Sequence, residues 1–535
     1  MNVLAFHLGH DGSITVVSEN EVIAHHQLDR YNKFKHQSLY TFEVLQKVKD
    51  FKIKFDKIIL TSMGPLWGAT TIIFLKRFFN VNINQIIILG QTQHHIFHAY
   101  CAKFFYQLDK NFIIFVADGE GATQFFNHPS RYINNLKIVE NETIYNENLE
   151  NIYNKFYTER PLNFIDKKTK IINSISLGKG YSQLTYELGL KQEEEGKAMA
   201  LSSYGTARES IINNLIHRDN WNKNFIDDKV EFYDNTNNFN KFLLNPDINH
   251  LSKNSPSLDF VSSFQKAFEI LFLKTLNKIN YENKTILLSG GCAQNVLNNT
   301  NLKNTLDNKI LPDPFNGDFG ISLGAALWAT NNDVKPLKHI CSGFEPEQDL
   351  NAFLPYKNKN ISIEEVANIL IKEPVAIISG KSEQGQRGLG FRSLLGNPLD
   401  ESILNKINEI KKREWYRPFA CTVLEEYASK LFEIETNETS PYMMFVYKSK
   451  DKRLKNVCSV DGFSRIQTLN KSFHPKYYDL INSFKQLTGL PAVLNTSLNL
   501  PGHVLCEEYN DVKYMMKNSE LKYCYIADKN KLIYK

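Results

Sequence analysis

The stretch "FIIFVADGEGATQFF" at residues 112–126 decides the fold, because an apolar run ends in an Asp-Gly turn and a second apolar run follows it. The same pattern occurs near the start of the chain, where residues 3–17 read "VLAFHLGHDGSITVV". Each stretch predicts two strands joined by a tight turn. Two such units in one chain indicate a duplicated α/β fold. The alternative interpretation is two unrelated hairpins, since Asp-Gly turns are common.

The segments around the two hairpins predict further regular structure. Short apolar runs at 3–7, 13–17 and 21–27 predict a three-stranded meander at the start of the chain. Apolar residues at helical spacing predict a helix over 258–276, and the run at 285–288 predicts a strand. Strands and helices therefore alternate, as expected for an α/β protein.

A glycine pair follows the strand at 285–288, in the segment "SGGCAQN". Gly290 and Gly291 would let the backbone approach a phosphate closely at the start of a helix. Together with Asn295 they are candidate nucleotide-binding residues. A glycine pair also occurs in many turns that bind nothing, so this alternative stays open.

The length of 535 residues predicts more than one structural unit. Periodicity fades over 329–360, where Pro and Asn gather, and this places a domain boundary. We expect an amino-terminal domain at 1–345 and a carboxy-terminal domain at 355–535. The second domain begins with a helix, a strand at 375–379 and a glycine-rich loop, which indicates another α/β unit.

Charge and cysteine usage narrow the class of protein. The net charge of +5 comes from scattered lysines without a block of like charge, so neither membrane binding nor direct nucleic acid binding is indicated. No apolar run is long enough to span a bilayer, and the first residues do not resemble a signal peptide. The 7 cysteines form no C-x-x-C pair and are expected to be reduced thiols of a cytoplasmic protein.

Three histidines lie within five positions in "HHIFHAY", which starts at residue 94. On a helix, His94 and His98 are four residues apart and share a face, the spacing with which helices hold a metal. Zinc proteases use this spacing with a glutamate general base after the first histidine, where this chain has His95. The pattern therefore argues against a protease. The alternative is a pair of packed or surface histidines.

Two carboxylates are candidates to complete a metal site with these histidines. Asp118 follows the predicted strand of "VADGEG", and Asp318 lies in the turn "NGDFG" before the small-residue helix "GISLGAALW". Two imidazoles and two carboxylates would bind Fe(II), Mn(II) or Zn(II) and leave open coordination positions. Each aspartate could instead be a turn or cap residue.

Arginines form a second candidate site in the carboxy-terminal domain. This Lys-rich chain places several arginines there beside Gly, Ser or Pro: Arg387, Arg392, Arg413, Arg417 and Arg465. Arginine is favoured where planar, bidentate contact with phosphate or carboxylate is needed. The pattern indicates a site for one or more phosphates, and the alternative is solvated surface charge.

These segments, taken in order, resemble the O-carbamoyltransferases of the nodulation-factor and aminoglycoside (tobramycin-type) family. The resemblance runs nearly end to end and is specific because many short motifs keep the family's order. They are "GHDGS", "DRYNKFKH", "HHIFHA", "DGEGAT", "EGKAMALSSYG", "LSGGCAQN", "GDFGISLGAAL", "EQGQRGLGFRSLL", "KKREWYRPFA", "VDGFSRIQT" and "LTGLPAVLNTSLN". The family implies a duplicated actin-like (ASKHA) ATPase-type amino-terminal domain and a YrdC-like α/β carboxy-terminal domain.

The resemblance also implies roles for individual residues. It implies a metal, Fe(II) in the first place, bound by His94, His98, Asp118 and Asp318. It places the catalytic histidines His10 and His36 near the acceptor. In the carboxy-terminal domain it implies carbamoyl phosphate and ATP ligands at Arg387, Lys411, Arg417, Ser464, Arg465, Asn495 and Ser497.

The chain departs from the family's pattern at two places. The family's loop Phe-Gly-Pro-Arg-Ala-Leu-Gly is replaced by "QGQRGLG" at residues 384–390. Losing Pro and gaining Gly removes backbone restraint, so Arg387 is expected to be less preorganised. The family's "MGLAPYG" is replaced by "ALSSYG" at residues 200–205, which changes the acceptor side.

The function implied by the resemblance is ATP-dependent transfer of a carbamoyl group from carbamoyl phosphate to a hydroxyl of a small acceptor. ATP with Mg(II) would be a co-substrate, and the acceptor would be a sugar, an antibiotic intermediate or a hydroxymethyl nucleotide. A homodimer is compatible with this function. Two other classes stay open: a nucleotide-dependent binding or regulatory protein of the actin-like fold, and a small-molecule kinase.

Overall fold

The computed structural model describes two compact units. The described residues are 1–36, 40–61, 68–89, 93–119, 121, 123–126, 136–158, 165–166, 169–172, 176–191, 193–217, 256–337, 339–346 and 348–535. The first unit contains Val3–Gly9 and Phe55–Pro336, and the second contains His10–Lys54 and Leu337–Lys535. The prediction of a continuous domain over 1–345 did not anticipate that residues 10–54 group with the carboxy-terminal residues.

The first sheet contains five strands in the described part of the chain, in the order β3-β2-β1-β4-β5. β2 and β3 are antiparallel, whereas β1, β4 and β5 are parallel. The predicted meander at the start of the chain is confirmed. The strands are β1 (Val3–His7), β2 (Ser13–Ser18), β3 (Glu21–Gln27), β4 (Lys57–Thr61) and β5 (Ile86–Leu89).

The second sheet repeats this arrangement. Its inner strands lie in the order β9-β8-β6-β12-β13, with β8 antiparallel to β9 and with β6, β12 and β13 parallel. The prediction of a duplicated α/β fold is therefore confirmed. The strands are β6 (Phe112–Ala117), β7 (Thr123–Phe126), β8 (Leu136–Asn146), β9 (Asn151–Thr158), β10 (Ile165–Asp166), β11 (Thr169–Ile172), β12 (Thr285–Ser289) and β13 (Ile310–Pro312).

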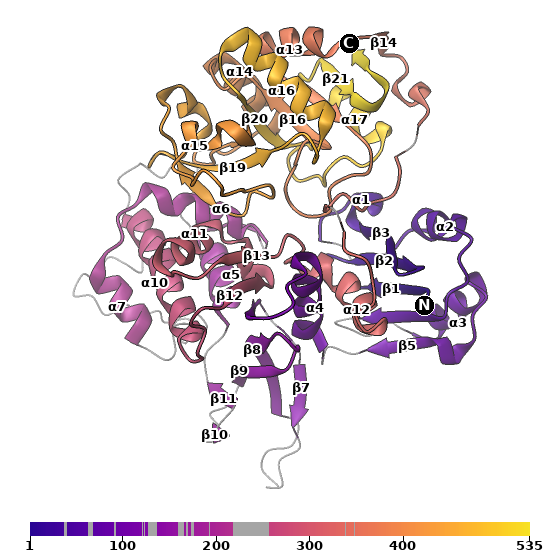
Figure 1. Cartoon of the computed structure of the whole chain (residues 1–535), viewed down its shortest axis with the longest axis vertical. Coiled ribbons are helices and arrows are strands. Elements are labelled where there is room, and N and C mark those ends of the chain that lie inside the picture. The colour runs from indigo at the N-terminus through magenta and orange to yellow at the C-terminus, as the bar shows by residue number, and fades with distance from the viewer. Residues whose placement is uncertain are drawn as a thin grey trace. The chain divides into compact units, whose positions relative to one another are not determined.

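Helices α4 and α12 occupy equivalent places, because α4 follows β5 and α12 follows β13. They pack against each other (Figure 1), and Gly324 permits this, since a Cβ there would lie 2.1 Å from the carbonyl oxygen of Phe97. The predicted helix at 258–276 is confirmed as α10. The helices of this unit are α3 (Ala69–Phe78), α4 (His94–Tyr106), α5 (Leu177–Glu187), α6 (Glu195–Leu201), α7 (Glu209–His217), α10 (Pro256–Leu276), α11 (Val296–Thr305) and α12 (Ile321–Ala329).

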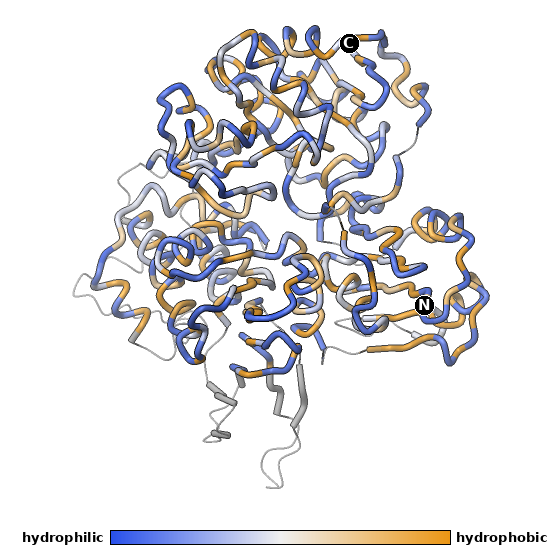
Figure 2. Tube along the Cα trace, in the orientation of Figure 1, coloured by the Kyte–Doolittle hydropathy of each residue, from blue (hydrophilic) through white to orange (hydrophobic). Residues whose placement is uncertain are grey.

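The core of the second copy lies between α4 and the strand β6. Ala99 and Ala102 of α4 are fully buried against Ile114 and Val116 of β6 and against Leu287 of β12. Figure 2 shows hydrophobic residues running along the strands, as burial on both faces of a parallel sheet requires. This packing fixes the start of α4 relative to the end of β6.

The second unit is built on a mixed nine-stranded sheet in the order β14-β22-β21-β15-β16-β20-β17-β19-β18. The expected α/β character is confirmed, and the YrdC-like topology stays a prediction. The strands are β14 (Lys357–Asn360), β15 (Val375–Ile378), β16 (Arg392–Gly396), β17 (Ala420–Leu424), β18 (Val446–Lys448), β19 (Phe463–Leu469), β20 (Ala492–Ser497), β21 (Tyr523–Ile526) and β22 (Lys531–Tyr534).

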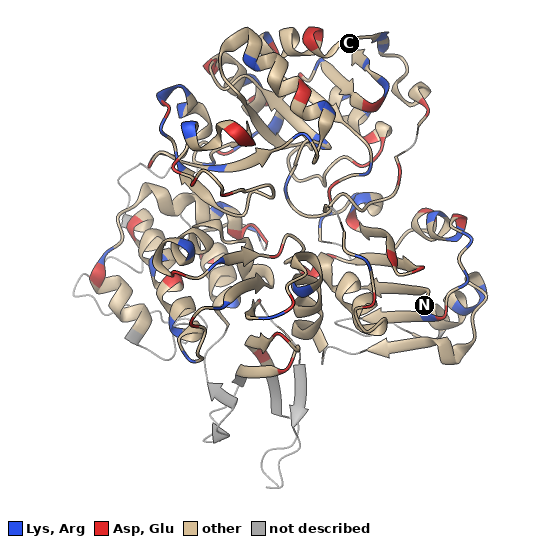
Figure 3. Cartoon of the chain, in the orientation of Figure 1, with Lys and Arg blue, Asp and Glu red and all other residues tan. Residues whose placement is uncertain are grey.

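The second unit contains helices from both the amino-terminal segment and the carboxy-terminal residues. They are α1 (Asp29–Asn32), α2 (Phe42–Asp50), α13 (Ile363–Lys372), α14 (Glu401–Lys411), α15 (Ala428–Leu431), α16 (Pro475–Thr488) and α17 (Tyr509–Lys517). Helix α13 begins with a capping box, in which Ser362 and Glu365 satisfy each other's backbone N–H groups. Among the described helices, none combines the length and apolarity needed to cross a bilayer. Figure 3 shows positive and negative residues interspersed along both units.

The cysteines give a first testable prediction. All 7 thiols are free, and all except the half-buried Cys458 are buried. Burial raises the pKa of Cys458 to about 11, which slows its reaction, but its partial exposure still favours it over the others. We expect a thiol reagent to label Cys458 first in the folded protein and to count 7 thiols in unreduced, denatured protein. A count of five would reveal a disulfide and contradict the structure.

Candidate functional site

The predicted metal residues come from corresponding places in the two copies of the fold. His94 begins α4, and His98 lies one turn later on the same helix. Asp318 begins the short turn Asp318–Gly320 that leads into α12. Asp118 directly follows β6. Because α4 packs against α12 and this turn, the four side chains converge.

Two imidazole nitrogens face two carboxylate oxygens at this point. His94 Nε2 lies 3.0 Å from Asp118 Oδ2 and 3.3 Å from Asp318 Oδ1. His98 Nε2 lies 3.3 Å and 3.7 Å from the same two oxygens. One ligand atom from each residue lies within 4.8 Å of all the others. The structure thus brings together the four residues grouped in the sequence analysis.

The carboxylate of Asp118 is oriented by backbone groups. Its Oδ1 accepts hydrogen bonds from the N–H groups of Gly119 (2.7 Å) and Gly291 (3.2 Å). Its Oδ2 is therefore the oxygen that faces the histidines. Outer hydrogen bonds of this kind hold ligating carboxylates in place in metal sites.

His7 adds a third imidazole that the sequence analysis missed. It is the last residue of β1, and its Nε2 lies 3.9 Å from Asp318 Oδ2. Its Nδ1 is within hydrogen-bond distance of Thr61 Oγ1, at 2.9 Å. A histidine that ends an otherwise apolar strand was the signal available in the sequence.

The electrostatics of the four residues are those of a cation site. Burial alone would lower the pKa of His94, but Asp318 and Asp118 outweigh burial and raise its pKa well above the usual value. The same two carboxylates raise the pKa of His98 against burial. The buried carboxylates thus draw positive charge onto the imidazoles. A divalent ion would supply that charge instead of protons, so the donor set fits Fe(II), Mn(II) or Zn(II).

His95 points away from this group. It is fully buried, and its Nδ1 lies 2.9 Å from Thr143 Oγ1 and 3.4 Å from Glu140 Oε2. Its ring packs on Gly121, where an added Cβ would lie 2.4 Å from His95 Nε2. His95 therefore supports the turn after β6, in which Gly121 lies three residues after Asp118.

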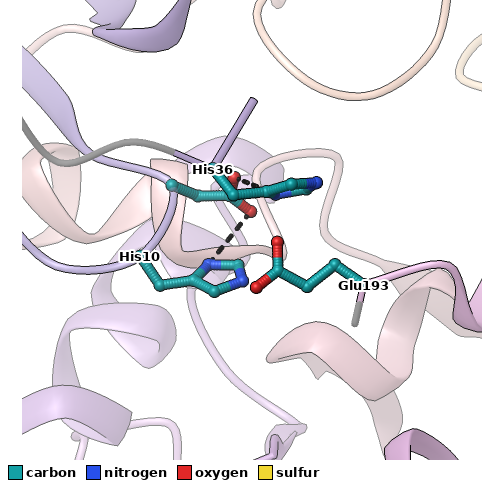
Figure 4. Close-up of side chains that lie close together, drawn as sticks. His10, His36 and Glu193 are labelled. Atoms are coloured by element: carbon teal, nitrogen blue, oxygen red, sulfur yellow. Dashed lines mark hydrogen bonds and ion pairs between the residues drawn. The ribbon is translucent and has the colours of Figure 1, made fainter. Parts of the chain in front are cut away.

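The predicted catalytic histidines lie together on one carboxylate of the second unit. His36 Nδ1 lies 2.7 Å from Asp11 Oδ1, and His10 Nδ1 lies 3.4 Å from Asp11 Oδ2 (Figure 4). The two imidazole rings are 5.3 Å apart. Both histidines are partly exposed, whereas Asp11 is buried. Asp11 is the aspartate of the first Asp-Gly turn and corresponds to Asp118 in the second turn.

The glycine pair after β12 allows a close backbone approach and supplies a backbone hydrogen bond. Gly290 has a φ of +82°, and a Cβ there would lie 2.3 Å from the carbonyl oxygen of Ala117. Gly291 donates its N–H to Asp118. Asn295 caps α11 by accepting the N–H of Asn298 at 3.0 Å. The contact of Gly291 orients Asp118, a candidate metal ligand, and nucleotide binding by Gly290, Gly291 and Asn295 stays a prediction.

Four half-buried arginines gather in the second unit, three of them in the segments before β16 and β17 and the fourth on strand β19 itself. They are Arg387, Arg413, Arg417 and Arg465. Burial, followed by repulsion from Arg417, lowers the pKa of Arg387 to about 10 and that of Arg413 to about 9. Burial and the other three guanidinium groups lower the pKa of Arg465 well below its usual value. Like charges held this close fit an anion-binding site.

Few protein groups compensate these charges. Arg417 Nη1 donates to Glu414 Oε2 at 3.0 Å, and Arg413 donates to the carbonyl oxygens of Arg417 and Pro418. The Nε atom of Arg465 is buried and has no hydrogen-bond partner. An unpaired buried donor is costly, so a ligand oxygen at this point would stabilise the cluster.

The other predicted ligands of this site bond to protein groups. Lys411 Nζ donates to the carbonyl oxygens of Ser497 (2.8 Å) and Asn499 (2.7 Å). Ser464 Oγ donates to the carbonyl oxygen of Val457 at 2.6 Å. Asn495 is buried and donates to the carbonyl oxygen of Gly388 at 3.1 Å. These side chains hold the loops that carry the arginines, and direct ligand binding by Lys411, Ser464, Asn495 and Ser497 stays a prediction.

Sequence comparison identifies the family of this chain. Residues 29–327 match the family described as carbamoyltransferase N-terminus, and residues 366–533 match carbamoyltransferase C-terminus. The chain belongs to the carbamoyltransferase family. Family membership makes it an enzyme, which confirms that prediction and disfavours a binding or regulatory protein without transferase activity.

The chain is also similar to individual proteins. An uncharacterized protein of Methanocaldococcus jannaschii is 27% identical over 533 residues and covers 95% of both chains. Nodulation protein NolO of Bradyrhizobium diazoefficiens is 32% identical over 47% of this carbamoyltransferase and 50% of its own length. Nodulation protein U of the same organism is 30% identical over 46% of this chain and 45% of its own length.

Solved structures match the carbamoyltransferase at low similarity. The activator of 2-hydroxyisocaproyl-CoA dehydratase from Clostridium difficile has a TM-score of 0.35 and 12% identity, covering 62% of this chain and 96% of its own. ROK hexokinase from Thermus thermophilus has a TM-score of 0.27 and 10% identity, covering 61% of this chain and 98% of its own.

Proposed function

We propose that this carbamoyltransferase uses ATP and carbamoyl phosphate to carbamoylate a hydroxyl group of a small acceptor. The observation that carries the proposal is the arginine cluster of the second unit, with the unpaired Nε of Arg465. A transferase that needed only a metal site would have no use for a repulsive group of four guanidiniums. Phosphate-rich substrates such as carbamoyl phosphate and MgATP supply the negative charge that this cluster lacks.

The first half-reaction forms carbamoyl adenylate. Water cleaves carbamoyl phosphate to carbamate and phosphate, a carbamate oxygen bonds to the α-phosphorus of ATP, and pyrophosphate leaves. Arg387, Arg417 and Arg465 would hold the phosphates in line for this displacement. Their guanidinium groups would also neutralise the charge that develops on the leaving pyrophosphate.

The second half-reaction transfers the carbamoyl group. The acceptor oxygen bonds to the carbamoyl carbon, AMP leaves, and the hydroxyl proton moves to a base. His36 fits the role of base, because the contact of its Nδ1 with Asp11 orients the imidazole. His10 on the same carboxylate is the second candidate.

In this proposal the four candidate metal ligands also act in the transfer of the carbamoyl group. His94, His98, Asp118 and Asp318 would hold a divalent ion, which as a Lewis acid would polarise the phosphate of the adenylate. Backbone donors to Asp118 keep the carboxylate facing the imidazoles. A kinase would need the nucleotide site alone and would leave the arginines of the second unit without a role.

Mass spectrometry of the acceptor tests the proposal. The purified protein is incubated with MgATP, carbamoyl phosphate and candidate sugars, aminoglycosides or hydroxymethyl nucleosides. We expect one acceptor class to gain a single carbamoyl group only when both co-substrates are present. Gain of a phosphoryl group instead would assign the chain to a kinase reaction and overturn the proposal.

A further inference from the structure

The loop that carries Arg387 lacks the restraint of a proline, yet both ends of it are bound by side chains. The loop runs from Gln384 to Gly390 between β15 and β16 and contains three glycines. Gly385 and Gly390 have φ angles of +131° and +102°, which favour glycine. Such a loop would lose much conformational freedom on folding, so its order needs explicit contacts.

The far end of the loop is held by neighbouring strands of the same sheet. Asn495 donates to the carbonyl oxygen of Gly388 at 3.1 Å, and Gln467 donates to that of Leu389 at 3.0 Å. The buried carboxylate of Glu383 accepts the N–H of Leu389. These contacts fix the residues that follow Arg387.

The near end is held by the amino-terminal segment. Gln27 Oε1 accepts the N–H of Gly385 at 2.9 Å, and Arg30 Nη2 donates to the carbonyl oxygen of Gly385 at 2.8 Å. Arg30 Nη2 also donates to Gln27 Oε1 at 2.7 Å, so the two side chains form one unit. The backbone N–H of Gln27 donates to the side chain of Gln384 at 2.9 Å. Both polar groups of Gly385, two residues before Arg387, are thereby satisfied.

This clamp is buried and anchored. Gln27 is 5% exposed and Arg30 is 2% exposed, which strengthens their hydrogen bonds by excluding water. Farther along the segment, Lys33 pairs with Asp511 at 2.7 Å and Lys47 pairs with Glu508 at 3.1 Å. The ion pairs fasten the segment to α17 without touching the loop.

We propose that Gln27 and Arg30 are positioning residues of the anion site, which hold the Gln384–Gly390 loop so that Arg387 faces the bound phosphate. The proposal rests on the proposed function, because it takes the arginine cluster as the carbamoyl phosphate site. It assigns part of the adenylate-forming site to residues 27–30, although every ligand predicted from the sequence for that site lies at 387 or beyond. The clamp replaces the backbone restraint that proline gives to the family's loop.

Two matched substitutions separate positioning from packing. Gln27 acts through the oxygen Oε1, so Gln27→Glu keeps the acceptor and Gln27→Leu removes it at similar volume. Binding of carbamoyl phosphate to the full chain is measured by calorimetry, with inorganic pyrophosphate as a second probe. We expect Gln27→Leu to weaken binding of both anions about 10-fold or more and Gln27→Glu to stay within about threefold of wild type. Lys47→Met, which removes the ion pair with Glu508 and the cation–π contact with Tyr31 but no contact with the loop, should bind as wild type does.

A second variant covers the case in which Gln27→Leu does not fold. Arg30→Lys keeps the charge, but its ammonium is on a shorter side chain without the planar guanidinium that places Nη2 between Gly385 and Gln27. We expect Arg30→Lys to lose more affinity for the anions than Gln27→Glu and less than Gln27→Leu, with unchanged metal content. Wild-type affinity in both Gln27→Leu and Arg30→Lys would overturn the clamp. If the wild-type protein binds pyrophosphate but not carbamoyl phosphate, the proposed function fails, and the clamp is then tested by pyrophosphate binding alone. If it binds neither anion, both the proposed function and the clamp are overturned.

Discussion

Replacing His98 by alanine is expected to abolish carbamoyl transfer while pyrophosphate release continues. His98 is fully buried, and its Nε2 lies 3.3 Å from Asp118 Oδ2, so the substitution removes one of the four candidate ligand atoms. Loss of a direct ligand should weaken metal binding by more than about 100-fold, the upper end of the effect of outer contacts. The arginine cluster belongs to the other unit and is untouched, so adenylate formation should stay within about twofold of wild type.

His95→Ala is the matched control for this variant. His95 lies on the same helix and is equally buried, but its Nδ1 contacts Thr143 and not the aspartates. We expect His95→Ala to retain most of the metal in elemental analysis, whereas His98→Ala retains almost none. Full metal content in His98→Ala would show that these histidines serve packing only.

Replacing Arg465 by methionine is expected to lower the kcat/KM of pyrophosphate release about 100-fold. Nε of Arg465 has no hydrogen-bond partner in the protein, so in the proposed site it donates to a phosphate. Methionine removes this charge-assisted hydrogen bond, which contributes about 1.5–3 kcal/mol. Arg417→Ala should show a loss of similar size. Arg453→Met is the control, because Arg453 is exposed and paired with Asp451, and it should stay near wild type.

Arg465→Met is also expected to raise the thermal stability of the protein, although it lowers the activity. Burial and, after it, the three other arginines depress the pKa of Arg465, so its charge destabilises the folded protein when no anion is bound. Methionine keeps the aliphatic stem and removes the charge. We expect the midpoint of thermal unfolding of Arg465→Met to rise by about 2 °C without ligand. A fall in the midpoint together with normal pyrophosphate release would mean that Arg465 serves the fold and not a ligand.

Local patterns pointed to the duplicated fold and to the candidate metal residues, and the family resemblance supported both. The Asp-Gly turns at Asp11 and Asp118 predicted the repeat, because a strand that ends in such a turn leaves a short, recognisable signature. His94 and His98 were recognisable because helical periodicity places them on one face. Asp318 was recognised because it lies in the turn "NGDFG" before a helix of small residues.

Residues that act through the tertiary structure were not predictable in this way. Gln27 and Arg30 lie more than 350 positions before the loop they hold, and nothing in their local sequence indicates a partner. His7 is a single polar residue at the end of a buried strand, a place where histidines commonly only pack. The grouping of residues 10–54 with the carboxy-terminal unit likewise depends on contacts that no local pattern encodes.

The acceptor, the location, the homodimer and the identity of the metal stay predictions from the sequence. The identity of the acceptor depends on the shape of a surface that residues 200–205 alone do not define. Cytoplasmic location, the homodimer and the choice among Fe(II), Mn(II) and Zn(II) stay predictions as well. Two imidazoles and two carboxylates bind each of these ions, and elemental analysis of the purified protein distinguishes them.

Pyrophosphate release by the wild-type protein tests the central claim most directly. The protein is incubated with MgATP, with and without carbamoyl phosphate, and the nucleotide products are separated. The account predicts pyrophosphate, and AMP after transfer or hydrolysis of the adenylate, only when carbamoyl phosphate is present. Formation of ADP, or an equal rate of ATP cleavage without carbamoyl phosphate, would contradict it.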